Sequence, residues 1–229
     1  MLYANKSQIK KIISKDRLDG YFNEVQRRHG QCDLLEVYTY YSWNILLSES
    51  LYASLQALEV SLRNSIQNIG KQHFGNAFWF EDPTIMHSSN IKHVTAAKDS
   101  LIRQNKNVDA GRIVAELHFG FWNSLFYARY EYKIWRPLFK KIFPMMDWTR
   151  YNRKFVSTRL EKIRRLRNRA FHFEPIWYRN LTQIHSEIVE LISWIEPAMV
   201  NLLNPVDHFP ACCTQDKLDE IRNELRQIY

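Results

Sequence analysis

The chain has 229 residues, of which 45% are hydrophobic and 14% aromatic, so it can bury a sizeable core and is not a disordered chain. Its formal net charge of +8 favours a nucleic acid as partner, with an anionic membrane surface or a merely solvated surface as the alternatives, and says little about the fold. No run of apolar residues is long enough for a signal peptide or a membrane span. We therefore expect a cytoplasmic protein that has no membrane partner.

The predicted elements of the first half are helices. Residues 7–29 are expected to form one or two short basic helices, with a break at "SKDRLDG" (residues 14–20). From residue 33 to about 71 the apolar residues recur at steps of three and four, which is typical of an amphipathic helix. An aromatic loop, "FGNAFWFEDP", follows, and residues 90–105 form the next predicted helix.

The second half continues the helical pattern. Gly120 is expected to interrupt one helix and Pro197 to kink another near its end. Because no alternation typical of a strand occurs, the predicted fold class is all-α. We expect one domain whose segments are a core at about 33–203, an N-terminal helical appendage at 1–32 and a C-terminal helix at 214–228. Within the second half, the helical segments are predicted at 112–130, parts of 134–148, 150–173 and 177–203.

The helix at 150–173 contains an unexpected charge. Arg167 takes a place on its apolar stripe where a leucine is expected. An arginine there is costly unless it is paired or hydrogen-bonded. It either pairs with a carboxylate of a neighbouring helix or presents its guanidinium group to an anion. The predicted stripe consists of Val156, Leu160, Ile163, Arg167 and Ala170.

A single histidine, His172, lies at the end of the same helix, since Pro175 disfavours helical geometry in the residue before it. Histidine changes charge near neutral pH, so it suits general acid or base catalysis, although one at a helix end also caps carbonyl groups. Asn168 lies four residues earlier, on the same side of the helix. The spacing alone is weak, because similar spacings occur at Arg112 to His118 and at Arg179 to His185.

Three segments, in order along the chain, resemble HEPN-domain proteins of the Abi-like (abortive infection) family. The first is "LYASLQALEVSLRNSIQNIG" (51–70), the second "AELHFGFWNSLF" (115–126), and the third "RLRNRAFHFEPIW" (165–177), which contains the R-N-x-x-x-H core. The resemblance extends over roughly residues 33–200. Family members often have a second histidine after the first, where this chain has Phe173.

The resemblance implies a HEPN-type helical bundle and a metal-independent endoribonuclease in abortive infection, phage defence or a toxin–antitoxin pair. Arg167, Asn168 and His172 would be its catalytic residues, and no metal or cofactor is expected. Because HEPN sites are composite and this chain has one motif, a homodimer is expected. RNA is the expected substrate, and a small structured RNA is a further expected partner.

Residues around this motif are assigned supporting roles. Glu59 and Arg63 are four apart and would form a pair that either supports the core or lies beneath the catalytic residues, with Asn64 lining the cleft. The RNA backbone would be held by Lys162, Arg164, Arg165 and Arg169.

Other chemistries have less support. The chain has no P-loop, no glycine-rich dinucleotide loop and no H-E-x-x-H motif. Cys212 and Cys213 are adjacent, with His208 nearby, but they lack the spacing of metal ligands, so with Cys32 we expect reduced thiols. The alternatives to the ribonuclease are a non-catalytic RNA-binding protein, which would use exposed aromatic residues, and a protein-binding regulator, which would use the terminal helix.

Overall fold

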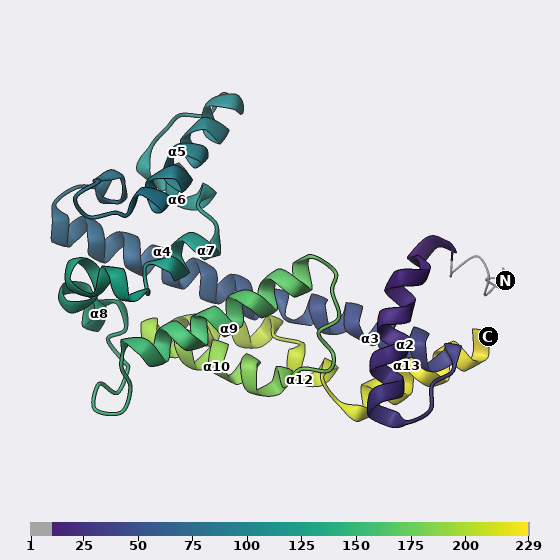
Figure 1. Ribbon diagram of the computed structural model, residues 1–229. Helices are drawn as coiled ribbons and strands as arrows, with labels where there is room; N and C mark the ends of the chain where they lie inside the picture. The colour runs from purple at the N-terminus through teal and green to yellow at the C-terminus, as the bar shows by residue number, and fades with distance from the viewer. Residues whose placement is uncertain (1–10, 229) are drawn as a thin grey trace. The chain divides into compact units, whose positions relative to one another are not determined.

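The computed structural model describes residues 11–228, and this part of the chain is all-α, as predicted, with no strand (Figure 1). Residues 7–10 of the expected N-terminal helices lie outside it. Short 3₁₀ or π segments lie at Trp79–Glu81, Ala128–Tyr130, Glu131–Trp135 and Asn204–Val206. The α-helices are α2 (Lys15–His29), α3 (Leu34–Ser50), α4 (Tyr52–Phe74), α5 (Ser88–Arg103), α6 (Ala110–Glu116), α7 (Phe119–Ser124), α8 (Arg136–Ile142), α9 (Arg153–Phe171), α10 (Leu181–Ile195), α11 (Pro197–Leu203), α12 (Phe209–Cys212) and α13 (Gln215–Ile228).

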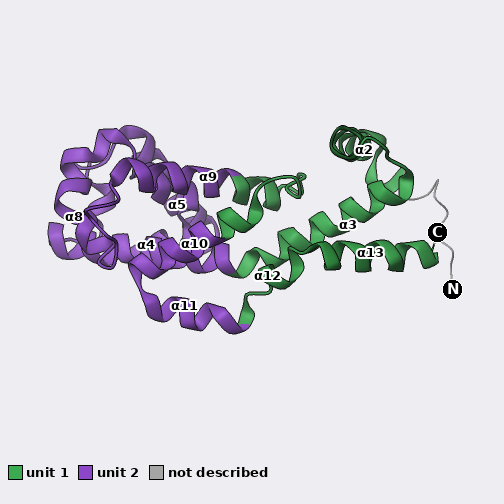
Figure 2. Ribbon diagram, turned by 90° about the horizontal axis from the view of Figure 1, so that it is seen from below, with its two compact units in different colours: residues 1–53, 166–185, 206–229 green, residues 54–165, 186–205 purple. Residues whose placement is uncertain are grey.

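The described residues form two compact units (Figure 2). Unit 1 takes in the described parts of residues 1–53, 166–185 and 206–229, and unit 2 takes in residues 54–165 and 186–205. Helix α9 begins in unit 2 and ends in unit 1, so the motif at its end belongs to unit 1. The expectation of a single domain stays a prediction.

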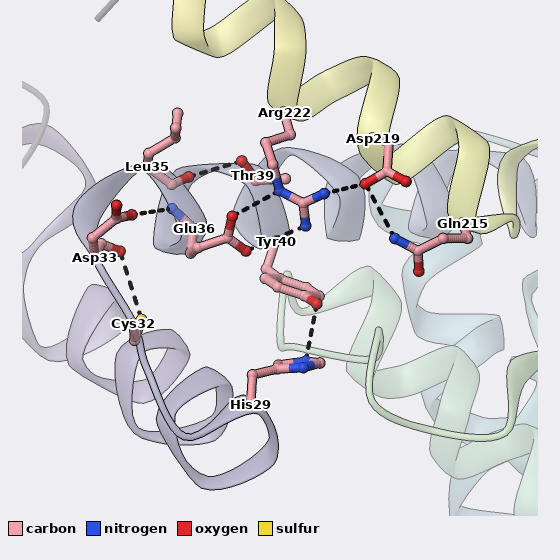
Figure 3. A network of polar contacts seen from close by, with 10 residues as sticks. All are labelled: His29, Cys32, Asp33, Leu35, Glu36, Thr39, Tyr40, Gln215, Asp219 and Arg222. Atoms are coloured by element: carbon pink, nitrogen blue, oxygen red, sulfur yellow. Dashed lines mark hydrogen bonds and ion pairs between the residues drawn. The ribbon is translucent and has the colours of Figure 1, made fainter.

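Unit 1 is built on α3, against which both α2 and α13 pack. Asp33 caps α3, since its side chain accepts a hydrogen bond from the backbone N–H of Glu36. Figure 3 shows how α13 is attached: the Arg222 guanidinium donates to Glu36 Oε1 at 2.7 Å and also pairs with Asp219. The segment that the sequence assigned to a C-terminal helix thus shares a unit with the end of α9.

Unit 2 has an aromatic core that includes Phe121, Trp122 and Phe126. Gly70 lies inside α4. The position requires glycine, because a Cβ there would lie 2.4 Å from the Trp79 indole. The helix ends at Phe74, before Gly75, whose φ of +67° suits glycine.

Two breaks lie elsewhere than the sequence predicted. Gly120 is inside α7, and the break falls before it, because the His118 side chain caps α7 by accepting from the Phe121 N–H. Pro197 does not kink α10. It begins α11, where its missing N–H costs nothing, and Glu196 supplies the cap.

The N-terminal break is also shorter than expected. It is confined to Ser14, and α2 then runs continuously through Gly20. Leu18, Tyr21 and Val25 are buried along one side of α2, and this burial outweighs the poor helix propensity of glycine.

Candidate functional site

Helix α9 carries the candidate site at its C-terminal end, and its buried side differs from the predicted stripe. Leu166, not Arg167, continues the buried line into Ala170, while Arg167 is only partly buried. A step of three from Ile163 satisfies a helical stripe as well as a step of four, and the apolar side chain takes the buried place. Leu166 therefore takes the fully buried place that the spacing assigned to Arg167, whose side chain is partly buried with its Nε enclosed.

The backbone turns sharply directly after α9. Phe173 has a φ of +59°, its N–H donates to Ala170 O at 3.1 Å, and the Glu174 N–H donates to Arg169 O at 2.9 Å. This pair of bonds is a Schellman motif, with phenylalanine in the place usually taken by glycine. His172 is the residue between the helix and the left-handed residue, and its side chain is exposed.

Arg167, Asn168 and His172 lie together around this helix end. The His172 backbone N–H donates to Asn168 O at 2.9 Å, which extends the helical hydrogen bonding up to the histidine. The Arg167 Cζ lies 4.7 Å from the centre of the Phe171 ring, so the guanidinium packs on the residue directly before His172. The last turns of α9 and the residue that follows the helix thus carry a cation and an imidazole within six residues of the chain.

Two residues outside the predicted site fix the same turn. Asn44 on α3 is buried, and its Oδ1 accepts from the backbone N–H groups of Ile176 at 2.7 Å and Trp177 at 3.2 Å. Arg17 on α2 donates to the Phe173 carbonyl at 3.0 Å. Neither residue was foreseen, because nothing in a single sequence pairs positions more than 100 residues apart. Arg17 was assigned to an appendage.

The four cations expected to hold RNA are all engaged with carboxylates of the chain. Lys162 Nζ lies 2.9 Å from Glu187 Oε1, and Arg169 Nη1 lies 3.0 Å from Glu174 Oε2. Arg164 and Arg165 share Glu161, at 2.8 and 2.9 Å. The pairs of Arg164, Arg165 and Arg169 are partly exposed, so each is weak and a phosphate group can compete for the cation. The pair of Lys162 differs, because Glu187 is buried.

Glu161 joins several groups of unit 2. It accepts hydrogen bonds from both arginines, and its Oε2 accepts from Asn123 Nδ2 at 3.0 Å. The hydrogen bond from Arg164 is the main cause that lowers the pKa of Glu161 to about 2, and Arg165 adds to it. The sequence did carry a signal for these pairs, because Glu161 lies three and four residues before the two arginines.

We expect Glu161→Gln to destabilise the protein near neutral pH and to have less effect in acid. The folded carboxylate has a pKa of about 2 and the unfolded one about 4.5, so its stabilisation is complete above pH 4.5 and is lost as the pH falls towards 2. The difference in unfolding free energy should be about 1 kcal/mol at pH 7, since the pair is partly solvated.

Urea unfolding at neutral and acidic pH measures this difference, with Glu224→Gln as the control at an exposed position of α13. A Glu161→Gln effect that stays constant with pH, or that grows in acid, would contradict the assignment.

The expected support from α4 stays a prediction. Glu59 and Arg63 lie on α4 in unit 2 and are partly buried, and Asn64 is exposed. Of the other site residues, Lys162, Arg164 and Arg165 belong to unit 2, whereas Arg167, Asn168, Arg169 and His172 belong to unit 1.

The cysteines are free thiols, and all three are partly buried. Burial raises the pKa of the Cys213 thiol, which lies 3.8 Å from Thr182 Oγ1. Within residues 11–228, no three His, Cys, Asp or Glu side chains come together as a group that could hold a metal ion. None of the described helices is both long and apolar enough to cross a lipid bilayer.

Comparisons of the chain with known protein families, with curated proteins and with solved structures find no match.

Proposed function

We propose that the chain is a metal-independent endoribonuclease of the HEPN type, which acts in abortive infection, phage defence or a toxin–antitoxin pair. One observation carries the proposal. The exposed His172 follows α9 in a turn fixed by backbone hydrogen bonds, and the guanidinium of Arg167 packs 4.7 Å from the ring of the residue before it. An imidazole suits proton transfer and a guanidinium suits charge stabilisation on a phosphate, and here the end of α9 and the turn after it supply both.

The proposed reaction needs only groups of the RNA and the protein. A ribose 2′-OH loses its proton to a base and attacks the adjacent phosphorus, while the bond from phosphorus to the 5′-oxygen breaks. The leaving oxygen takes a proton, and the products are a 2′,3′-cyclic phosphate and a 5′-hydroxyl. His172 supplies the proton transfer, Arg167 stabilises the charge that develops on the phosphorane, and Asn168 positions the reacting groups.

A homodimer completes the proposed site. One copy offers one imidazole, whereas the reaction needs both a proton acceptor and a proton donor, and a second copy of the turn supplies the other group. Lys162, Arg164, Arg165 and Arg169 guide the RNA backbone by exchanging their carboxylate partners for phosphates. A strong decrease of RNA affinity with salt would accompany this exchange.

A 2′-deoxy substitution in the RNA tests the reaction directly. We expect cleavage in EDTA to stop at a bond whose 5′ nucleotide lacks its 2′-OH, because that hydroxyl is the nucleophile. The measurement is gel analysis of an end-labelled strand, with the substitution moved to a neighbouring position as the control. Cleavage that persists at the deoxy position, or products with a 3′-hydroxyl and a 5′-phosphate, would show that water is the nucleophile and contradict the mechanism.

A second candidate function is non-catalytic RNA binding, for example to a small structured RNA. The exposed rings of Phe171 and Phe173 favour it, because they can stack on unpaired bases whether or not a bond is cut. RNA that is retained equally by the wild type and by His172→Ala, with no cleavage by either, would identify this function.

A further inference from the structure

Unit 1 contains a cavity of about 1130 Å³ beside the turn that carries His172. Its wall includes Tyr41 and Ile45 of α3, Tyr52 at the start of α4, and the two phenylalanines on either side of the histidine, Phe171 and Phe173. Sites for small molecules usually enclose about 300–1,000 Å³, so this cavity has room for a ligand of nucleotide size or somewhat larger. Every residue of its lining belongs to unit 1.

The cavity has aromatic side chains that are left exposed. Tyr52 is 52% exposed, Phe171 41% and Phe173 72%, and the rings of Tyr52 and Phe171 are 6.1 Å apart and tilted by 57°. Large aromatic residues gain free energy by burial, so their gathering on one exposed surface indicates a binding site. The tilt leaves the two rings unstacked on each other, so a planar ligand can lie against either face.

The cavity also offers positive charge. Arg17 and Lys217 both contribute to its lining, together with the carboxylate of Glu49. Lys217 also pairs with Glu220 at 2.8 Å, so Arg17 is the main cation that the cavity offers. The Arg17 guanidinium is held at the turn by its 3.0 Å hydrogen bond to the Phe173 carbonyl. Aromatic faces next to cations are the combination with which proteins bind single-stranded nucleic acids, where bases stack and phosphates meet the basic groups.

We propose that this cavity receives one unpaired base of a single-stranded RNA. The base stacks on Tyr52 and Phe173, and Arg17 contacts the adjoining phosphate. The inference rests on the proposed function for its substrate, because Phe171 and Phe173 flank His172 in the chain and the bound base would be a neighbour of the cleaved bond. Because a base that is paired in a duplex cannot enter the cavity, the protein would then select single-stranded RNA for cleavage at His172.

Binding of a strand that cannot be cleaved separates this inference from catalysis. The probe is a fluorescein-labelled 2′-O-methyl RNA of about 12 nucleotides, measured by anisotropy with the full-length protein in EDTA. We expect Tyr52→Leu to weaken binding about 10-fold, because leucine keeps the apolar bulk and loses the stacking face. Tyr52→Phe should bind like the wild type.

Tyr132→Leu is the matched control, since Tyr132 is 72% exposed, belongs to unit 2 and is not one of the residues that line the cavity. It should leave the affinity unchanged. A second probe with abasic nucleotides tests the base itself. The wild type should bind it about 10-fold more weakly than the intact strand, whereas Tyr52→Leu should bind both strands alike.

The outcomes distinguish the two proposals. If Tyr52→Leu binds like Tyr132→Leu, or if intact and abasic strands bind the wild type equally, no base enters the cavity, even if His172-dependent cleavage is observed. Base-dependent binding without cleavage under any condition would support the proposal that the cavity binds a base and would contradict the proposal that the protein is a ribonuclease. Tyr52-dependent binding to phosphatidylglycerol vesicles, with no binding of RNA, would assign the cavity to an anionic lipid and overturn the inference.

Discussion

We expect His172→Ala to lower the rate of RNA cleavage in EDTA about 100- to 10,000-fold, the loss usual for a missing general acid or base. The fold should be unaffected, because the histidine side chain is exposed and its structural hydrogen bond uses the backbone N–H, which alanine retains. The unfolding free energy should therefore change by no more than about 0.5 kcal/mol. Initial rates on a labelled single-stranded RNA and urea unfolding of the same preparations measure both quantities.

The chain offers a matched control for this substitution. His73 is also an exposed histidine in the last turn of a helix, α4, but it lies outside the motif. His73→Ala should cleave RNA at the wild-type rate. Equal cleavage by His172→Ala and His73→Ala would mean that another group, or a contaminating nuclease, performs the reaction. That result would refute the proposed catalytic site.

The end of α9 shows what a sequence pattern can and cannot determine. Apolar spacing predicted the helix, and Pro175 predicted where it stops, because both effects are local. The choice between Leu166 and Arg167 for the buried place was not local, since adjacent residues differ by about 100° around the helix and the packing partners decide. The position of the charge at the edge of the core thus needed the structure.

The partners of the basic residues depended on tertiary structure to different degrees. Glu161 could be paired with Arg164 and Arg165 from their spacing within one helix. Lys162 pairs with Glu187, which lies on α10, and no spacing rule connects two helices. Net charge alone therefore overstated how many cations are free to meet RNA, because it counts residues and not their partners.

The cavity is the feature that was hardest to predict from the sequence. It is assembled from residues as far apart in the chain as Arg17, Tyr52, Phe173 and Lys217. No local sequence pattern distinguishes any of these residues from an ordinary surface residue. The packing of α2 and α13 on α3 brings the N-terminal and C-terminal segments into this unit, and Arg17 of α2 bonds directly to the turn after α9. The sequence analysis placed those segments outside the core, as an appendage and a C-terminal helix, whereas in the structure both contribute residues to the cavity.

We expect Asn44→Leu to loosen the segment that follows His172, with a cost of about 2–6 kcal/mol. Asn44 is only 3% exposed, and its Oδ1 is the acceptor for the Ile176 and Trp177 N–H groups. Leucine fills a similar volume but accepts no hydrogen bond, so two buried donors lose their partner, at about 1–3 kcal/mol each. Hydrogen exchange measures this locally, and the amides of residues 176 and 177 should exchange about 30-fold faster or more.

Asn68→Leu makes the same chemical change at an exposed position of α4 and should alter stability by no more than about 0.5 kcal/mol. Because Asn44 does not belong to the proposed reacting groups, its substitution should lower RNA cleavage only as far as it displaces the turn. The loss should therefore shrink at low temperature, where the segment is held by its remaining contacts. The loss from His172→Ala should persist there. If residues 176 and 177 remain protected in Asn44→Leu, the turn is held by other contacts, and the positioning role of Asn44 is refuted.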